Sequence, residues 1–346
     1  MYSPKHVLDT IFKCNLPLID APEQGLINNT YIVGTPPQFV LQWVNPIFSP
    51  LIHHDLDIVT KHLISKGQIS PTLYPLPNGQ LYGEDEEKGF WRMWTFIPGK
   101  TYHKMDSTSK AFCSGVGVGK FHQALSDLQH DFIAPPRGAH NTPEKMQNLQ
   151  CAIQNNKSHE LYDQVAQLGE AILQAWSTWS GVLEEPQRIC HGDLKISNLH
   201  FTDQNEVCAL LDLDTVARMG FSVEMGDAWR SWCNPAGEDD PNSVYFDINI
   251  FEHSLRGWLS QKIELQDIEK QNIPEGIERI CLELSARFCS DALQNTYFKE
   301  NLEQFPRKGE HNLHRALGQF KLAESVKKQR DQIFQIWNEQ LQIINK

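Results

Sequence analysis

Three oxygen-bearing side chains stand in an order that suits the handling of phosphate groups and a divalent cation. Asp193 lies in a loop that begins at His191, Asn198 follows five residues later, and Asp212 ends an apolar run that starts at Val207. A carboxylate accepts the proton of an attacking hydroxyl, and carboxylate and amide oxygens suit Mg²⁺. The spacing of Asp193 and Asn198 is that of a kinase catalytic loop. The pattern therefore predicts phosphoryl transfer from ATP to a hydroxyl.

A β-hairpin is predicted to bring two of these groups together. Leu199–Phe201 and Val207–Leu211 have the composition of strands, and the polar stretch Thr202–Glu206 between them is a turn. Asn198 precedes one strand and Asp212 follows its partner, so we expect both side chains at the same end of the hairpin.

The residues around this pair receive further predicted roles. Asp214 is a third candidate metal ligand, and Lys195 is expected to neutralise charge on the transferring phosphoryl group as a catalytic residue beside Asp193. His191 is expected to orient the loop through hydrogen bonds rather than to act as a base.

Composition limits the partners of the chain. Its 346 residues are 40% hydrophobic and 21% charged, which is typical of a globular protein, and its net charge of −12 argues against binding nucleic acid. No apolar run approaches a membrane span, and no signal peptide is visible. The eight scattered cysteines include no C-x-x-C pair and favour reduced thiols. We expect a cytoplasmic protein whose partners are ATP and a small molecule; the composition leaves the oligomeric state open.

Hydrophobic periodicity divides the chain near residues 97–100. The first part, residues 1–98, is predicted to form a small β-rich lobe with one helix, which begins near Ile52 and ends at Gly67. Residues 99–346 are predicted to be mainly helical apart from the hairpin. The expected strands of the first part are 31–33, 39–44, 79–82 and 90–97, and the expected long helices of the second are 110–129, 161–183 and several from about 245 onward.

The loop and hairpin motifs, His191–Asn198 and Leu210–Asp214, resemble those of the aminoglycoside phosphotransferase and choline kinase superfamily. Within it, the chain is most similar to N-acetylhexosamine 1-kinases, and the similarity extends over nearly the whole chain. This resemblance implies a protein-kinase-like α+β fold with two lobes, and ATP-dependent phosphorylation of a sugar at its anomeric hydroxyl. The supporting segments are Asn28–Val33, Leu41–Asn45, Gly119–His122, His140–Pro143, Gly226–Arg230, Glu238–Asp240, Arg287–Asp291 and His311–Arg315.

The nucleotide side departs from the common kinase pattern. Gln42 stands where a lysine on the third strand usually reaches the phosphates, as it also does in the N-acetylhexosamine kinases that the chain resembles. Lys61 on the following helix is a candidate replacement. Asn29 and Thr30, in the turn that begins at Gln24, are predicted to bind phosphates, although a plain turn is an open alternative. We assign Phe96 to the nucleotide site with them.

One glycine-rich stretch, Gly115–Lys120, is similar in composition to a phosphate-binding loop. Gly115–Lys120 lacks the spacing of a P-loop, and Phe121 occupies the position of the required hydroxyl residue. Because the stretch falls within a helical pattern, we expect its glycines to allow close helix packing instead.

The acceptor is expected to bind on the helical side of Asp193. Arg230 and Asn234 are predicted to hydrogen-bond it, and so are His140 and Asn141, which lie in a loop. Gly226–Arg230 is predicted to open a helix. Asp227 is expected to support the catalytic loop, and Trp229 and Trp232 either stack on a pyranose ring or belong to the core.

Two other functions remain compatible with the sequence. Glu238–Asp240 is an acidic cluster that would suit a cationic acceptor, such as an amino alcohol or an aminoglycoside. The absence of the third-strand lysine leaves open a nucleotide-binding pseudokinase, although intact Asp193, Asn198 and Asp212 argue against it.

Overall fold

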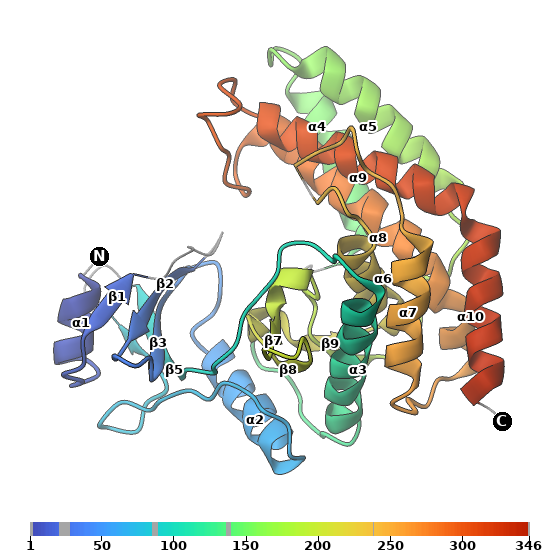
Figure 1. The fold of residues 1–346 in the computed structure, drawn as a ribbon. Helices are drawn as coiled ribbons and strands as arrows, with labels where there is room; N and C mark the ends of the chain where they lie inside the picture. The colour runs from blue at the N-terminus through green and yellow to red at the C-terminus, as the bar shows by residue number, and fades with distance from the viewer. Residues whose placement is uncertain (1–2, 21–27, 85–88, 136–139, 238, 345–346) are drawn as a thin grey trace.

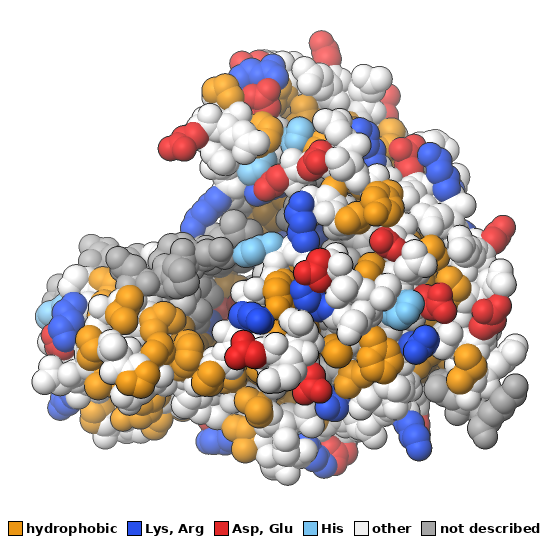
Figure 2. Space-filling view, viewed as in Figure 1, with side chains coloured by type: hydrophobic (Ala, Val, Ile, Leu, Met, Phe, Trp, Pro, Cys, Tyr) orange, Lys and Arg blue, Asp and Glu red, His pale blue; other side chains and the backbone are white. Residues whose placement is uncertain are grey.

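The computed structural model divides into a small β-rich lobe and a larger helical lobe (Figure 1). It describes residues 3–20, 28–84, 89–135, 140–237 and 239–344. The small lobe carries the N-terminus, and the helical lobe extends from α3 to the C-terminus. Within the described ranges, no helix is both long enough and apolar enough to cross a membrane. Basic and acidic side chains alternate over the face in Figure 2, so that face presents no continuous basic surface.

The small lobe is built on one antiparallel sheet with the strand order β1-β2-β3-β5-β4. The register places Gln42 of β3 directly opposite Arg92 of β5, which matters for the site described below. Helix α2 (Ile52–Ser65) follows β3 in the chain and packs against α3 of the helical lobe. The strands are β1 (Leu18–Asp20), β2 (Asn29–Val33), β3 (Phe39–Val44), β4 (Gly83–Glu84) and β5 (Phe90–Thr95).

The predicted strand at 79–82 was wrong. The Pro-Asn-Gly turn forms as expected, with Gly79 at φ +85°, but the ladder beyond it is only two residues long. The reason is competition for the edge of β5. The backbone of Thr72 and Tyr74 already hydrogen-bonds to Thr95 and Met93, so only the first residues of β5 are left for β4.

The sequence analysis also missed the helix that opens the chain. Helix α1 (Pro4–Thr10) has Ser3 as its N-cap, whose hydroxyl accepts a hydrogen bond from the His6 amide, and Pro4 in its first turn. Val7 and Leu8 pack into the small-lobe core. One turn of apolar residues is too short to give a helical period.

The helical lobe surrounds a long central helix, α8, which packs against α4, α5, α6 and α9. A capping box between Gln266 and Glu269 begins it, and Asn295 in the left-handed conformation ends it. The helices are α3 (Thr108–Leu125), α4 (Thr142–Asn155), α5 (Tyr162–Ser177), α6 (Phe221–Trp232), α7 (Ile248–Leu259), α8 (Asp267–Gln294), α9 (Glu310–Lys328) and α10 (Arg330–Ile344).

Two short sheets interrupt the helices on the side that faces the small lobe. Strand β6 (Arg188–Cys190) pairs with β9 (Ala217–Met219), and β7 (Leu199–Phe201) pairs with β8 (Val207–Leu210). The second sheet is the predicted hairpin. The small lobe ends close to it, since Lys100 forms a backbone pair with Phe201.

The glycines of the apparent phosphate loop lie inside α3 and allow it to pack closely against α7. A Cβ atom on Gly115 would lie 2.0 Å from the carbonyl oxygen of Ser254, and one on Gly257 would lie 2.1 Å from that of Phe112. The prediction of close helix packing at this stretch is confirmed.

We expect Gly115→Ala to lower the free energy of unfolding by about 1–3 kcal/mol, because the added methyl group meets backbone that cannot rotate away. Lys120→Ala is the control, since Lys120 is exposed on the same helix. It should change neither stability nor nucleotide affinity. Urea unfolding and nucleotide titration measure both effects. Loss of nucleotide binding in the Lys120 variant would restore the phosphate-loop interpretation.

Candidate active site

The β7–β8 hairpin brings Asn198 and Asp212 to the same end of one ladder. Leu199 pairs with Leu210, and the amide of Leu211 donates to the carbonyl oxygen of Asn198 at 2.9 Å. Asp212 follows at once in the left-handed conformation, with φ +59° and ψ +55°. The ladder therefore ends between the two residues, as the hairpin prediction required.

Asp193 is held by two neighbours through one of its oxygens. Lys195 Nζ lies 2.7 Å from Oδ2, and Asn198 Nδ2 donates to the same oxygen at 3.0 Å and to the backbone oxygen of Asp193 at 2.8 Å. These bonds use the amide nitrogen of Asn198, so its Oδ1 is left for a cation. Within the described ranges, every hydrogen bond to the Asp193 carboxylate goes to Oδ2, which leaves Oδ1 for an acceptor hydroxyl.

The carboxyl groups of Asp193 and Asp212 are shifted in opposite directions in pKa, because the charges around them differ. Burial acts to raise the pKa of Asp193, but Lys195, His191 and Arg230 together lower it below its usual value. Desolvation by the surrounding protein raises the pKa of Asp212, and the negative charges of Asp214 and Asp193 add to this effect, against Lys195. The ionised form of Asp193 is thus favoured, and Asp212 has too few cations nearby. A bound divalent cation fits this donor set, because it would supply the missing positive charge.

Asp214, a predicted metal ligand, is instead enclosed by the small lobe. Arg92 Nη1 and Nη2 contact its two oxygens, at 2.5 and 2.8 Å, and Asn28 Nδ2 donates to Oδ2 at 2.8 Å. The side chains of Arg92 and Asp214 are 1% and 2% exposed. Both carboxylate oxygens therefore already accept from protein donors. Asp214 is thus a structural carboxylate between the lobes, and Asn198 and Asp212 stay the predicted metal ligands.

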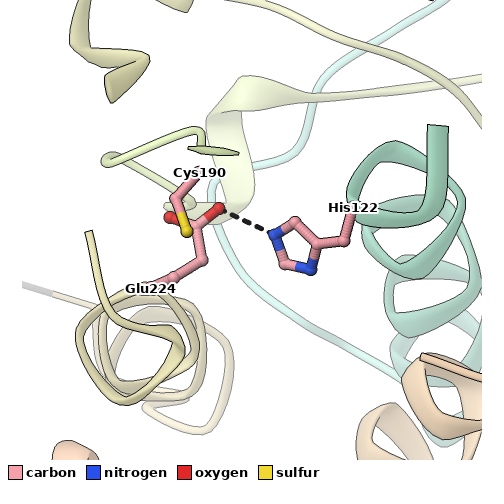
Figure 3. Close-up of side chains that lie close together, drawn as sticks. All are labelled: His122, Cys190 and Glu224. Carbon is pink, nitrogen blue, oxygen red and sulfur yellow. Dashed lines mark hydrogen bonds and ion pairs between the residues drawn. The ribbon is translucent and has the colours of Figure 1, made fainter. Parts of the chain in front are cut away.

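The loop that contains Asp193 is bound by a buried carboxylate on α6, that of Glu224 (Figure 3). This carboxylate accepts the backbone amides of His191 at 2.7 Å and Gly192 at 2.8 Å. His122 Nε2 lies 2.9 Å from the same carboxylate, and Trp258 Nε1 donates to His122 Nδ1 at 2.9 Å. Because the indole only donates, the proton of a neutral His122 is on Nε2, directed at Glu224.

The supporting role predicted for Asp227 therefore belongs to Glu224. Helix α6 begins at Phe221, five residues before the predicted start at Gly226, and this places Glu224 in its first turn under the loop. Cys190 lies beside His122 and Glu224 (Figure 3). Burial raises the pKa of its thiol well above the usual value, and the carboxylate is already saturated with donors. This cluster is a structural support rather than a metal centre.

His191 and Gly192 behave as the loop requires. His191 Nε2 lies 2.8 Å from the carbonyl oxygen of Leu211, and its Nδ1 accepts the amide of Asp193 at 3.3 Å. The prediction that His191 orients the loop is thus confirmed. Gly192 has φ +79°, and a Cβ atom there would lie 2.6 Å from the carbonyl oxygen of Thr215, so only glycine fits without strain.

On the nucleotide side, Gln42 is already hydrogen-bonded at both ends of its amide. Its Oε1 accepts from Arg92 Nε and from Trp94 Nε1, both at 3.0 Å, and its Nε2 donates to Thr30 Oγ1 at 3.1 Å. Lys61 pairs with Asp57 and is 70% exposed, so the cation in contact with Gln42 is Arg92, not Lys61.

The other predicted nucleotide residues lie in or next to the small sheet. Asn29 and Thr30 begin β2, and Phe96 directly follows β5 and is half-buried. Residues 24–27 of the predicted phosphate-binding turn lie outside the described residues.

The predicted acceptor residues on α6 and directly after it, Arg230 and Asn234, are engaged by other protein groups. Arg230 Nη2 pairs with Asp227 at 2.8 Å, and the amide of Asn234 bonds to the backbone of Ala236 and Gly237. The role of Asn234 is corrected to that of a turn residue.

Trp229 and Trp232 are 0% and 1% exposed, and they donate to Ser254 Oγ and to the carbonyl oxygen of Leu194. They belong to the core, so the stacking alternative is wrong.

His140 is the predicted acceptor residue that directly contacts the catalytic loop. Its Nε2 lies 3.1 Å from the carbonyl oxygen of Gly192, and its Nδ1 lies 3.1 Å from Glu283 Oε1. Both ring nitrogens face acceptors, so the ring satisfies both only as imidazolium. Asn141 instead caps α4, accepting the amide of Glu144, which corrects its predicted role.

Four residues that matter here were missed: Asn28, Arg92, Glu224 and Glu283. Arg92 carried a weak signal, as a charge in the otherwise apolar run 90–97. Glu224 and Glu283 lie within helical patterns where an acidic residue usually faces solvent. Nothing local distinguishes them, because their partners are 33 and 143 residues away.

The arrangement is that of a phosphotransferase, and comparison with known proteins agrees. The sequence profile of the phosphotransferase enzyme family (APH) matches residues 19–246. This is well over half of the chain, so the chain belongs to that family. No curated protein sequence matches the chain.

Solved structures with the same fold include three small-molecule kinases. A microcompartment-associated aminopropanol kinase has a TM-score of 0.62 at 14% identity, covering 94% of this chain and 97% of its own. A choline/ethanolamine kinase family protein from Mesorhizobium loti has a TM-score of 0.58 at 13% identity and 98% coverage of both chains. An amicoumacin kinase in complex with AMP-PNP, Ca²⁺ and Ami has a TM-score of 0.56 at 16% identity, covering 96% and 94%. At these identities the similarity establishes the fold, and the predicted protein-kinase-like bilobal fold is confirmed.

Glu224→Gln should lower kcat by roughly one to two orders of magnitude, because an amide nitrogen would face a backbone N–H and one charge-assisted bond would be lost. Nucleotide affinity should change little. Glu278→Gln is the matched control, a buried carboxylate on α8 whose partner is Lys327. Steady-state kinetics compares the two variants, and equal rates would contradict the role of Glu224.

The His140–Glu283 pair should make stability depend on pH. Burial acts to raise the pKa of Glu283, but His140 and other donors lower it to about 2. Burial acts to lower the pKa of His140, but Glu283 raises it above 6.5. The stabilisation is therefore full between about pH 4.5 and 6.5. It falls in acid as Glu283 protonates, and in base as His140 deprotonates.

Accordingly, His140→Gln should lower the free energy of unfolding by roughly 1.5–3 kcal/mol at pH 6, and by less at pH 9, because the wild type loses the charged bond as the pH rises. Glu283→Gln should show the same trend. Urea unfolding at the two pH values measures it. A cost that is independent of pH would mean that the imidazolium pair does not form.

Proposed function

We propose that the protein is an ATP- and Mg²⁺-dependent kinase that phosphorylates the anomeric hydroxyl of a neutral sugar of the N-acetylhexosamine type. The observation that carries this proposal is the Asp193 carboxylate, with one oxygen fixed by Lys195 and Asn198 and the other left for a hydroxyl. Membership of the phosphotransferase family supports the reaction class.

In the proposed step, Asp193 Oδ1 takes the proton of the acceptor hydroxyl while that oxygen bonds to the γ-phosphorus and the bond from phosphorus to the ADP oxygen breaks. Lys195, beside the carboxylate, offsets the negative charge of the transferring group. Asn198 and Asp212 would hold Mg²⁺, which neutralises phosphate oxygens when bound. Chemistry of this kind depends mainly on positioning and on charge compensation.

A neutral acceptor is supported by two acidic side chains near the loop that already have cationic partners. Asp227 pairs with Arg230, and Glu283 pairs with His140. A cationic acceptor needs unpaired carboxylates or an aromatic cage, and both α6 tryptophans lie in the core. In the predicted acidic cluster, Asp239 pairs with Arg315 and His311, and Glu238 lies outside the described residues.

Two buried polar atoms near His140 lack partners and match the chemistry of a sugar. Asp227 Oδ2 can only accept a hydrogen bond, and Arg279 Nη1 can only donate one. Arg279 Nη2 donates to the carbonyl oxygen of His140, and the charge of Asp227 raises the pKa of His140. Hydroxyl and acetamido groups both donate and accept, so a sugar could satisfy both atoms. The resemblance to N-acetylhexosamine 1-kinases supports the same acceptor.

An acceptor panel tests the proposal. ATP consumption would be measured with N-acetylglucosamine, N-acetylgalactosamine, choline, ethanolamine and an aminoglycoside. Phosphorus NMR of the product would then locate the phosphate. We expect turnover with an N-acetylhexosamine and a signal from phosphate on the anomeric carbon. Turnover with amines alone would replace the sugar by a cationic acceptor, and nucleotide binding without any turnover would favour a pseudokinase.

Asp193→Asn should reduce turnover by about 10²–10⁴-fold, because the amide cannot take the proton of the acceptor. Nucleotide binding should be nearly unchanged. Asp203→Asn is the control, because its side chain is 93% exposed in the turn between β7 and β8. A rate close to that of the wild type in the Asp193 variant would refute its role as the base.

A further inference from the structure

The small lobe does contain a buried cation at the nucleotide side, one strand away from the position where a kinase usually has its lysine. Gln42 occupies the usual position on β3, and the sheet register places Arg92 of β5 directly opposite. Arg92 is 1% exposed. Burial of an arginine is costly unless its charge is paired, so its contacts indicate what it does.

Gln42 orients this arginine. Its Oε1 accepts from Arg92 Nε and from Trp94 Nε1, so the carbonyl end of the amide faces β5 and the nitrogen end faces Thr30. Two donors on one oxygen fix the direction of the amide. The glutamine therefore fixes the guanidinium rather than reaching outward itself.

The guanidinium of Arg92 in turn binds Asp214, in the turn that follows the predicted metal ligand Asp212. Nη1 and Nη2 contact the two oxygens of Asp214, in the bidentate geometry for which arginine is suited. Asn28 of the small lobe adds a second donor to Asp214, and its own Oδ1 accepts the amide of Asn45. Asp214 is thus bound by Arg92 of β5 and by Asn28, which directly precedes β2, across the boundary between the lobes.

The contacts to Asp214 also restrict Asp212, which lies two residues earlier in the chain. Asp212 is in the left-handed conformation, and residues 213–215 form a tight 3-10 turn. Leu211, directly before Asp212, is fixed by the ladder, and Asp214, two residues after it, is fixed by Arg92 and Asn28, so the backbone of Asp212 has little freedom. His53 of α2 is buried nearby, but burial and the charge of Arg92 lower its pKa to about 4, so it is neutral and does not compete for Asp214.

We infer that Arg92 replaces the missing third-strand lysine, as a positioning residue that acts through Asp214 to hold Asp212 ready for the metal–nucleotide complex. A lysine at position 42 and an arginine at position 92 would then be alternative locations of one charge. The inference rests on the proposed phosphoryl transfer only in requiring nucleotide and metal, and it is independent of the acceptor.

A charge exchange tests this. Binding of AMP-PNP would be titrated calorimetrically over a range of Mg²⁺ concentrations for the wild type, Arg92→Gln, Arg92→Lys and the double variant Gln42→Lys with Arg92→Gln. We expect Arg92→Gln to raise the Mg²⁺ concentration at half-saturation at least tenfold. The lysine variant should be intermediate, and the double variant should recover at least threefold.

Arg188→Gln is the matched control, since Arg188 makes a similar bidentate contact with buried Glu269 in the helical lobe. It should leave the Mg²⁺ dependence within twofold of the wild type even if its Tm falls. An unchanged Mg²⁺ dependence in Arg92→Gln, or equal changes in both variants, would overturn the inference. If Arg92→Gln does not fold, Asn28→Ala, which removes a single contact to Asp214, should still shift the half-saturation about threefold, and no shift would count against the inference.

The measurement separates this inference from the proposed function. Normal Mg²⁺-dependent nucleotide binding that is lost in Arg92→Gln, together with no turnover on any acceptor, would refute the proposed reaction and support the role of Arg92. Sugar turnover by the wild type, together with an unchanged Mg²⁺ dependence of nucleotide binding in Arg92→Gln, would support the proposed reaction and refute the role of Arg92. A wild type that binds no nucleotide would contradict both.

Discussion

The site depends on one buried carboxylate that is satisfied by backbone. Glu224 is 0% exposed, and such a group is stable only when its lone pairs meet donors. The amides of His191 and Gly192, together with the His122 ring, provide them. Those three contacts fix the course of the loop immediately before Asp193. The position of Asp193 is therefore set by α6, through Glu224.

From that fixed loop, short-range contacts organise the reacting groups. Asp193 collects Lys195 and Asn198 on one oxygen, and this orients the Asn198 amide so that its oxygen is left for a cation. The hairpin ladder carries Asp212 to the same place. Each of these side chains is oriented by a neighbour that is itself fixed by hydrogen bonds. Such positioning is the main requirement of a reaction that needs little covalent chemistry from the protein.

Charge compensation distinguishes the two sides of the site. Toward the small lobe, Arg92 neutralises Asp214, and Asp212 is left without a comparable partner. Toward the helical lobe, Arg230 and His140 neutralise Asp227 and Glu283. The unbalanced negative charge therefore lies at Asp212, whereas Asp227 and Glu283 are paired. The proposal of an uncharged acceptor rests on this distribution.

The sequence by itself determined the catalytic loop, the hairpin and the two-lobe division, because these depend on local spacing: Asp193 and Asn198 share one loop, and the strand–turn–strand pattern around 199–211 is read within a dozen residues. Only the tertiary structure decided that Asp214 faces Arg92, that Glu224 rather than Asp227 supports the loop, and that Asn234 and Asn141 serve turns and caps. Those outcomes are competitions between donors and acceptors that are distant in the chain, such as Arg92 and Asp214, which are 122 residues apart. A pattern of residue types does not show which distant side chain will lie next to a given polar group. That depends on how the core packs.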